Sequence, residues 1–179
     1  MNIVKCDDAG LDAAAKTLSS GGVAVIPTDT VYGLAAHPAF PEAVDRLYAI
    51  KGRDRSKPIA LLAADFAAAS RFVGGMAEKP ARLAAMRWPG AFTLVVRGEG
   101  LRVPDHEWAR RLLARCGGTL RVTSANLSGM EPAKEAKSAI DQIGSLVDIV
   151  VDGGPSPGGR PSEVVRVTDD GETEIIRGG

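Results

Sequence analysis

The sequence predicts a protein of the α/β class with a mixed β-sheet. Short apolar runs of strand length alternate with segments whose apolar residues recur at helical spacing, and this alternation is typical of a sheet covered by helices. The chain then closes on two strands that flank Asp169, Asp170 and Gly171, a strong hairpin signal that makes the sheet mixed. With 179 residues, of which 45% are hydrophobic and 25% charged, we expect a single domain, residues 1–179, with its own core.

The first elements follow from apolar spacing and from terminator residues. A short strand is expected over residues 2–4, and a helix over 11–18 that stops before a pair of glycines. The four apolar residues Val23–Ile26 suit a buried strand. Pro41 favours the first turn of a helix, and this helix is expected to run to Lys51, just before Gly52.

The remaining elements are predicted in the same way. Asp65 and Asp105 each precede a helical pattern and are expected to act as N-caps. The expected helices cover an Ala-rich segment after Asp65, residues 81–88, a segment from Asp105 to Cys116, and Ala136–Ile143. The expected strands cover 59–63, Phe92–Val96, Thr119–Ser124, 147–151, 164–168 and Thr173–Arg177, with a glycine-rich loop over 153–159.

Three clusters of polar residues lie at the ends of apolar runs, where loops on a rigid scaffold commonly carry binding groups. They cover residues 26–34, 51–53 and 123–129. Their hydroxyls, amide, ammonium and guanidinium suit an anionic ligand with hydrogen-bonding edges, such as a nucleotide beside a small polar substrate. Each cluster alone also fits a plain turn or a solvated helix end. Their combination in one chain favours a binding site.

The second cluster concentrates positive charge. Residues 46–57 hold a single acid, Asp54, among the basic residues Arg46, Lys51, Arg53, Arg55 and Lys57. So many neighbouring cations are unfavourable unless an anion lies between them, and polyphosphate is a suitable anion for arginine and lysine. The whole chain has 22 basic and 22 acidic residues, which argues against a generally basic nucleic-acid binder.

The sequence contains no clear motif for a metal site or a P-loop. His37 and His106 have no partners at metal-ligand spacing, so both are expected to be structural or at the surface. Residues 153–159 lack the Lys-Ser/Thr ending of a P-loop. Cys6 and Cys116 are isolated, and neither a signal peptide nor a membrane span is evident, so we expect reduced thiols, a cytoplasmic location and no membrane partner.

Taken in chain order, these motifs resemble the YrdC-like family of threonylcarbamoyl-AMP synthases, whose signature joins a Lys-x-Arg segment to a Ser-x-Asn segment. The resembling stretches are residues 27–34, 51–58, 88–96, 102–106, 123–129 and 176–178. The resemblance extends from about residue 11 to residue 178. It implies a twisted open mixed sheet flanked by helices, in one YrdC-like domain with a basic concave face.

The resemblance also implies an activity, that of a nucleotidyltransferase. L-Threonine, bicarbonate and ATP would condense to threonylcarbamoyl-AMP (L-threonylcarbamoyladenylate) and pyrophosphate. Carried over by position, Lys51 and Arg53 would be catalytic. ATP would be bound by Lys51, Arg53, Lys57, Asn126, Lys134 and Arg177, and threonine by Thr28, Thr30, Tyr32, Arg102, Ser124 and Ser162. Mg²⁺ would be carried by ATP, with no metal site on the protein and no tightly bound cofactor.

The implied partner is a tRNA-modifying threonylcarbamoyl transferase complex acting on adenosine next to the anticodon, with weak RNA binding by this chain. Two alternatives stay open. A non-enzymatic module binding tRNA or double-stranded RNA would use the same basic face, although 4% aromatic residues is low for base stacking. A paralogue acting on another carbamoyl-type substrate is kept open by Glu163, which follows Ser162 where the family usually has threonine.

Overall fold

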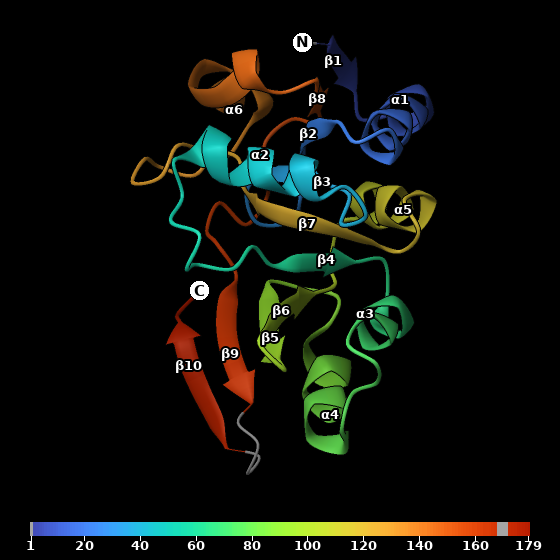
Figure 1. Ribbon diagram of the computed structural model, residues 1–179, viewed down its shortest axis with the longest axis vertical. Helices are drawn as coiled ribbons and strands as arrows, with labels where there is room; N and C mark the ends of the chain where they lie inside the picture. Colours follow the sequence, from blue (N-terminus) through green and yellow to red (C-terminus); the bar gives the residue numbers. More distant parts are fainter. Residues whose placement is uncertain (1, 168–171) are drawn as a thin grey trace.

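The computed structural model describes residues 2–167 and 172–179 and arranges them around one ten-stranded sheet (Figure 1). In these residues the strands are β1 (Asn2–Lys5), β2 (Val23–Ile26), β3 (Gly33–Ala36), β4 (Leu61–Ala63), β5 (Phe92–Val96), β6 (Glu99–Arg102), β7 (Thr119–Ser124), β8 (Ile149–Asp152), β9 (Glu163–Val167) and β10 (Thr173–Arg177). The helices are α1 (Asp8–Ser19), α2 (Pro41–Lys51), α3 (Phe66–Phe72), α4 (Glu78–Arg87), α5 (Glu107–Arg115) and α6 (Ala136–Ile143), with a 3₁₀ turn at Gly144–Leu146. Among the residues described, none of these helices is both long and apolar enough to cross a membrane.

The strand order is β1-β8-β2-β3-β7-β4-β6-β5-β9-β10. Parallel pairs, such as β2 with β8 and β5 with β9, occur beside antiparallel pairs, such as β2 with β3 and β3 with β7. The sheet is open, because β1 and β10 form its two edges. The predicted α/β class with a mixed sheet is confirmed.

Helices cover both faces of the first half of the sheet. Alternate residues of β2 point to opposite faces, as the period of a strand requires. Val23 and Val25 pack with α2 and α6, whereas Ala24 and Ile26 pack with α1 and α5. Because both faces are buried, β2 is apolar at every position.

The second half of the sheet carries α3 and α4 beside β4, β5 and β6, as the lower part of Figure 1 shows. β5 and β6 form a tight hairpin through Arg97 and Gly98, whose φ values are 52° and 82°. Two consecutive positive φ angles are typical of a type I′ turn. Asn-Gly is the usual signal for such a turn, so an Arg-Gly pair did not predict the hairpin.

Most predicted elements are confirmed, several with the same bounds: Val23–Ile26, Pro41–Lys51, Phe92–Val96, Thr119–Ser124, Ala136–Ile143 and Thr173–Arg177. Two strands were missed, β3 and β6. The expected turn residues Asp169, Asp170 and Gly171 lie outside the described residues, although β9 and β10 do pair antiparallel.

The predicted N-cap of α5 was wrong. Asp105 precedes the cap, and its neighbour His106 accepts the hydrogen bond from the backbone N–H of Ala109 through Nδ1, at 3.2 Å. Asp105 is exposed and forms an ion pair with Arg110. Aspartate is a usual N-cap residue and histidine is not. The residue types therefore predicted the N-cap one position before the observed one. Asp65 caps α3 as predicted.

Candidate active site

The sheet topology brings the first and third polar clusters to the same end of neighbouring strands. β3 lies between β2 and β7 and is antiparallel to both. β2 and β7 therefore run in the same direction, and their last residues, Ile26 and Ser124, both pair with Gly33. A Cβ on Gly33 would lie 2.6 Å from Cγ1 of Val122. Glycine is thus needed where the two clusters meet.

The second cluster joins them through Lys51, the last residue of α2. Gly52 ends this helix in the left-handed conformation, with a φ of 60°. The Lys51 ammonium donates to the carbonyl oxygens of Ser124 and Asn126, at 2.6 and 2.7 Å. It also lies 3.3 Å from Ser124 Oγ and 3.2 Å from Asn126 Oδ1. An ammonium has three donors, so Lys51 fixes the end of β7.

Lys51 is buried, with 3% of its surface exposed. Burial lowers the pKa of its ammonium from 10.5 to about 8, with a smaller contribution from the positive charge of Arg53. A lysine in this environment carries a proton at neutral pH and loses it in mildly alkaline solution.

Asn126 shapes the loop after β7. Its side-chain amide donates to the carbonyl oxygens of Leu127 and Met130, both at 2.8 Å, while Oδ1 faces Lys51. The backbone N–H of Ser128 donates to the carbonyl oxygen of Lys51 at 2.8 Å. The Lys-x-Arg and Ser-x-Asn segments therefore form one hydrogen-bonded unit.

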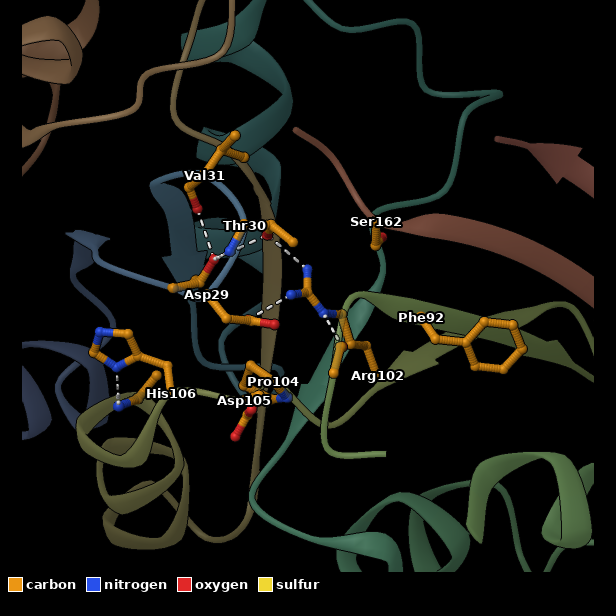
Figure 2. Close-up of polar contacts among 12 residues, drawn as sticks. Asp29, Thr30, Val31, Phe92, Arg102, Pro104, Asp105, His106 and Ser162 are labelled. Carbon is orange, nitrogen blue, oxygen red and sulfur yellow. Dashed lines mark hydrogen bonds and ion pairs between the residues drawn. The ribbon is translucent and has the colours of Figure 1, made fainter. Parts of the chain in front are cut away.

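Arg102, at the end of β6, connects this region to the turn after β2 (Figure 2). Its Nη1 donates to Thr30 Oγ1 at 2.9 Å, and its Nη2 donates to Asp29 Oδ1 at 2.5 Å. Nε donates to the carbonyl oxygen of Gly90 at 3.0 Å. The ion pair is buried, since only 7% of the Arg102 side chain and 10% of the Asp29 side chain are exposed.

The turn that carries Asp29 is held from two sides. Thr28 Oγ1 donates to the carbonyl oxygen of Val31 at 2.7 Å and accepts from the backbone N–H of Thr30 at 3.2 Å. On the other side, Gly158 and Gly159 donate their backbone N–H groups to the carbonyl oxygens of Asp29 and Thr30, at 3.0 and 2.8 Å. The glycine-rich loop of residues 153–159 thus supports the turn directly.

Tyr32 lies beneath this loop in the core, with no exposed surface. Its hydroxyl donates to the carbonyl oxygen of Gly154 at 2.7 Å and accepts from the N–H of Gly153 at 3.0 Å. Burial raises the pKa of the phenol. Tyr32 anchors the glycine-rich loop in this structure, and its predicted contact with threonine stays a prediction.

Ser162, Thr93 and Arg177 gather on the Arg102 side of the site. Ser162 Oγ lies 2.8 Å from Thr93 Oγ1, and both residues are buried. Arg177 of β10 donates to the carbonyl oxygen of Ser162 through Nη2, at 2.7 Å. Partial burial lowers the pKa of Arg177, and the positive charges of Arg102 and Arg53 lower it further. The Arg177 guanidinium is therefore close enough to Arg102 and Arg53 for their positive charges to act on it.

The other predicted ATP-binding residues lie further out. Arg53 donates to the carbonyl oxygens of Lys57 and Pro58, at 2.9 and 3.1 Å, which folds the 53–58 segment into a bend. The side chain of Lys57 is exposed. Lys134 is also exposed, and its carbonyl oxygen accepts from Ser156 of the glycine-rich loop at 2.7 Å. None of these contacts involves a nucleotide, so the ATP-binding roles of Arg53, Lys57 and Lys134 stay predictions.

Glu163 is turned away from the predicted threonine site. Its carboxylate pairs with Arg87 of α4 at 2.5 Å, and the Arg87 guanidinium lies over the Phe92 ring, 4.3 Å from its centroid. The preceding side chain, Ser162, faces Thr93 instead. Ser162 precedes β9 and Glu163 begins it, and the two side chains have different partners. The negative charge of Glu163 is therefore compensated by Arg87 on the α4 side.

Two residues of this constellation were missing from the predicted site. Asp29 lies between two predicted threonine-binding residues, and its place in the first cluster was the available signal. Thr93 lies inside an apolar strand, where only its polar character marks it. Across the part of the chain that the structure describes, no three His, Cys, Asp or Glu side chains gather in a group that could hold a metal ion.

Comparisons with known proteins agree with this arrangement. The model of the Sua5/YciO/YrdC family, described as telomere recombination, matches residues 16–179. The threonylcarbamoyl-AMP synthase of Vibrio vulnificus is 33% identical over 171 residues, covering 86% of this chain and 91% of the relative. The threonylcarbamoyl-AMP synthase of Bacillus subtilis is 31% identical over 179 residues, covering 92% of this chain and 52% of the relative.

Among solved structures, the chain matches Sua5 of P. abyssi complexed with L-threonine, with a TM-score of 0.89 and 26% identity. That match covers 99% of this chain and 57% of the P. abyssi chain. The chain thus spans little more than half the length of the B. subtilis and P. abyssi proteins. The matched family model and the relative covered over nine-tenths of its length show that this chain belongs to the Sua5/YciO/YrdC family.

Proposed function

We propose that this protein is an L-threonylcarbamoyladenylate synthase, an enzyme of the nucleotidyltransferase class. It would condense L-threonine, bicarbonate and ATP into threonylcarbamoyl-AMP and pyrophosphate. The observation that carries the proposal is the Lys51 ammonium, which binds Ser124 and Asn126 across the site and so joins two distant motifs. The family membership and the named activity of the relatives support it.

ATP is proposed to lie on the side of Lys51 and Arg53. Lys51 supplies a fixed positive charge and holds Asn126 in place. Arg53, Lys57, Lys134 and Arg177 would supply further donors for the phosphates and the nucleoside. Magnesium is proposed to arrive with ATP as part of the substrate.

Threonine is proposed to lie on the side of Arg102, Thr30 and Ser162. The Arg102 guanidinium uses one N–H on each of its three nitrogens for protein contacts. A guanidinium has five N–H donors, so two remain for the carboxylate of the amino acid. Thr28, Tyr32 and Ser124 would shape the remainder of this subsite.

The chemistry requires positioning more than a protein nucleophile. The amine of threonine and bicarbonate form a carbamate with loss of water. A carbamate oxygen then attacks the α-phosphorus of ATP, the bond to the bridging oxygen breaks, and pyrophosphate leaves. Negative charge grows on the phosphate oxygens during this step, and fixed cations such as Lys51 and Arg53 stabilise it without reorganising.

The product is proposed to pass to a tRNA-modifying threonylcarbamoyl transferase complex. The test of the activity is direct. The protein is incubated with ATP, magnesium, bicarbonate and threonine, the adenylate is measured by mass spectrometry, and pyrophosphate release is followed in parallel with serine as the competing substrate. Absence of the adenylate under these conditions contradicts the proposal.

The role of Arg53 is tested with a matched control. Arg53→Ala should lower pyrophosphate release on the order of 10²- to 10³-fold, by analogy with the loss of one preorganised donor. Arg55→Ala should keep it, because Arg55 is exposed, pairs with Asp45 and lies over the Tyr48 ring. Equal turnover in the two variants would refute a phosphate-binding role for Arg53.

A further inference from the structure

The second oxygen of the Asp29 carboxylate is unused. Arg102 binds Oδ1, and no group of the described residues binds Oδ2. Among the described residues, Ser156 Oγ is the only fully enclosed side-chain polar atom that lacks a hydrogen-bond partner. Oδ2 of Asp29 lacks a partner without being fully enclosed, so a ligand can reach it. A carboxylate offers about four acceptor positions. Asp29 is therefore nine-tenths buried and still presents an open acceptor beside the predicted threonine subsite.

The geometry of the turn fixes where this acceptor points. The carbonyl oxygen of Asp29 is held by Gly158, and the next residue is held by Thr28 and Gly159. Figure 2 shows the Asp29 carboxylate directed toward the Arg102 guanidinium, with Ser162 beyond it. The unused acceptor of Asp29 and the two unused N–H donors of Arg102 are thus carried by the two partners of one ion pair.

No second cation of the described residues pairs with Asp29. The ring of His106 is close enough for the Asp29 charge to raise its pKa, but burial outweighs this and lowers the pKa of His106 overall. Nδ1 of His106 accepts the N–H of Ala109, which requires that nitrogen to be unprotonated. The histidine is therefore neutral at neutral pH, and Asp29 keeps acceptor capacity for a ligand cation.

A ligand that matches this pair carries an anion and a cation two bonds apart, which describes an α-amino acid zwitterion. Resting on the proposed function, we propose that Asp29 binds the α-ammonium of threonine through Oδ2 while Arg102 binds its carboxylate. Asp29 then selects amino acids over hydroxy acids of the same shape. The inference concerns recognition, and no proton transfer is assigned to Asp29.

The experiment compares L-threonine with its hydroxy-acid analogue, in which a hydroxyl replaces the amine, by calorimetric titration of the full chain. The wild-type protein should bind threonine about 10- to 100-fold more tightly, since a hydrogen bond between charged groups contributes on that scale. In the Asp29→Asn variant the ratio of the two dissociation constants should fall toward one. The asparagine keeps an oxygen for Arg102 but loses the charge. If Asp29 had a purely structural role, its substitution would weaken the binding of both ligands equally.

The control is Asp105→Asn, because Asp105 is exposed and pairs with Arg110 in the same region. It should keep the wild-type preference. If Asp29→Asn does not fold, the wild-type comparison decides: equal affinity for the two ligands overturns the proposal. An unchanged preference in Asp29→Asn overturns it too. Formation of the adenylate by the wild-type protein is measured separately, so that failure of the proposed function is distinguished from failure of this assignment.

Discussion

The buried ammonium of Lys51 predicts an unusual dependence of stability on pH. Its pKa is about 8 in the folded protein against 10.5 for an ordinary lysine. Between these values the unfolded chain holds a proton that the folded protein has released, so the free energy of unfolding should rise with pH. The difference between the two pKa values corresponds to about 3 kcal/mol for this residue. Below pH 8 both states are protonated and the folded protein carries the whole desolvation penalty.

The perturbation is Lys51→Met, which keeps most of the side-chain volume and removes the titrating group. Urea unfolding of the wild type and the variant is measured at several pH values from 7 to about 10.5. Subtracting the two curves cancels the tyrosines, cysteines and other lysines. The free energy of unfolding of the wild type minus that of the variant should increase by about 3 kcal/mol as pH rises. Lys16→Met, at an exposed position of α1, should give no such change.

If the difference between the free energies of unfolding of the wild type and Lys51→Met does not change with pH, the lowered pKa of Lys51 is contradicted. The carbonyl oxygens of Ser124 and Asn126, at 2.6 and 2.7 Å, would then compensate fully for burial and keep the ammonium charged. Turnover gives an independent check. If the charge of Lys51 assists catalysis, wild-type activity should fall above pH 8, in the range where stability rises.

Two further substitutions test the walls of the site. Arg102→Gln leaves the buried Asp29 carboxylate without its cation and should cost about 3–5 kcal/mol of stability, whereas Arg166→Gln in an exposed pair should cost less than about 1 kcal/mol; similar values for the two, measured by urea unfolding, would contradict the buried pair. Gly158→Ala places a Cβ 2.6 Å from the carbonyl oxygen of Asp29 and should lower stability by about 1–3 kcal/mol and weaken threonine binding. Gly178→Ala meets nothing within 4 Å, and equal affinities of the two alanine variants for threonine would show that the glycine-rich loop does not support the turn.

Local pattern was sufficient for much of the fold. Four consecutive apolar residues identified β2, and Pro41 with Gly52 marked both ends of α2. These signals depend on contacts within a few residues, which the sequence displays directly. β3 was missed because Gly33 and two alanines have low strand propensity. It is a strand because β2 and β7 pair with its two edges and the helices on both faces of the sheet bury its side chains.

For the candidate site too, some features could be predicted from the sequence and others could not. The chemical groups available to the site can be identified from the sequence alone, since the Lys-x-Arg and Ser-x-Asn segments and the Pro-Thr-Asp-Thr turn can be read from composition and spacing. The contacts of Lys51 with Ser124 and of Arg102 with Asp29, each between residues 73 apart along the chain, follow from the three-dimensional fold. The order of strands in the sheet sets such pairs, and hydrophobic packing of both faces sets that order. No local pattern in a sequence records which distant strand end a charged side chain will face.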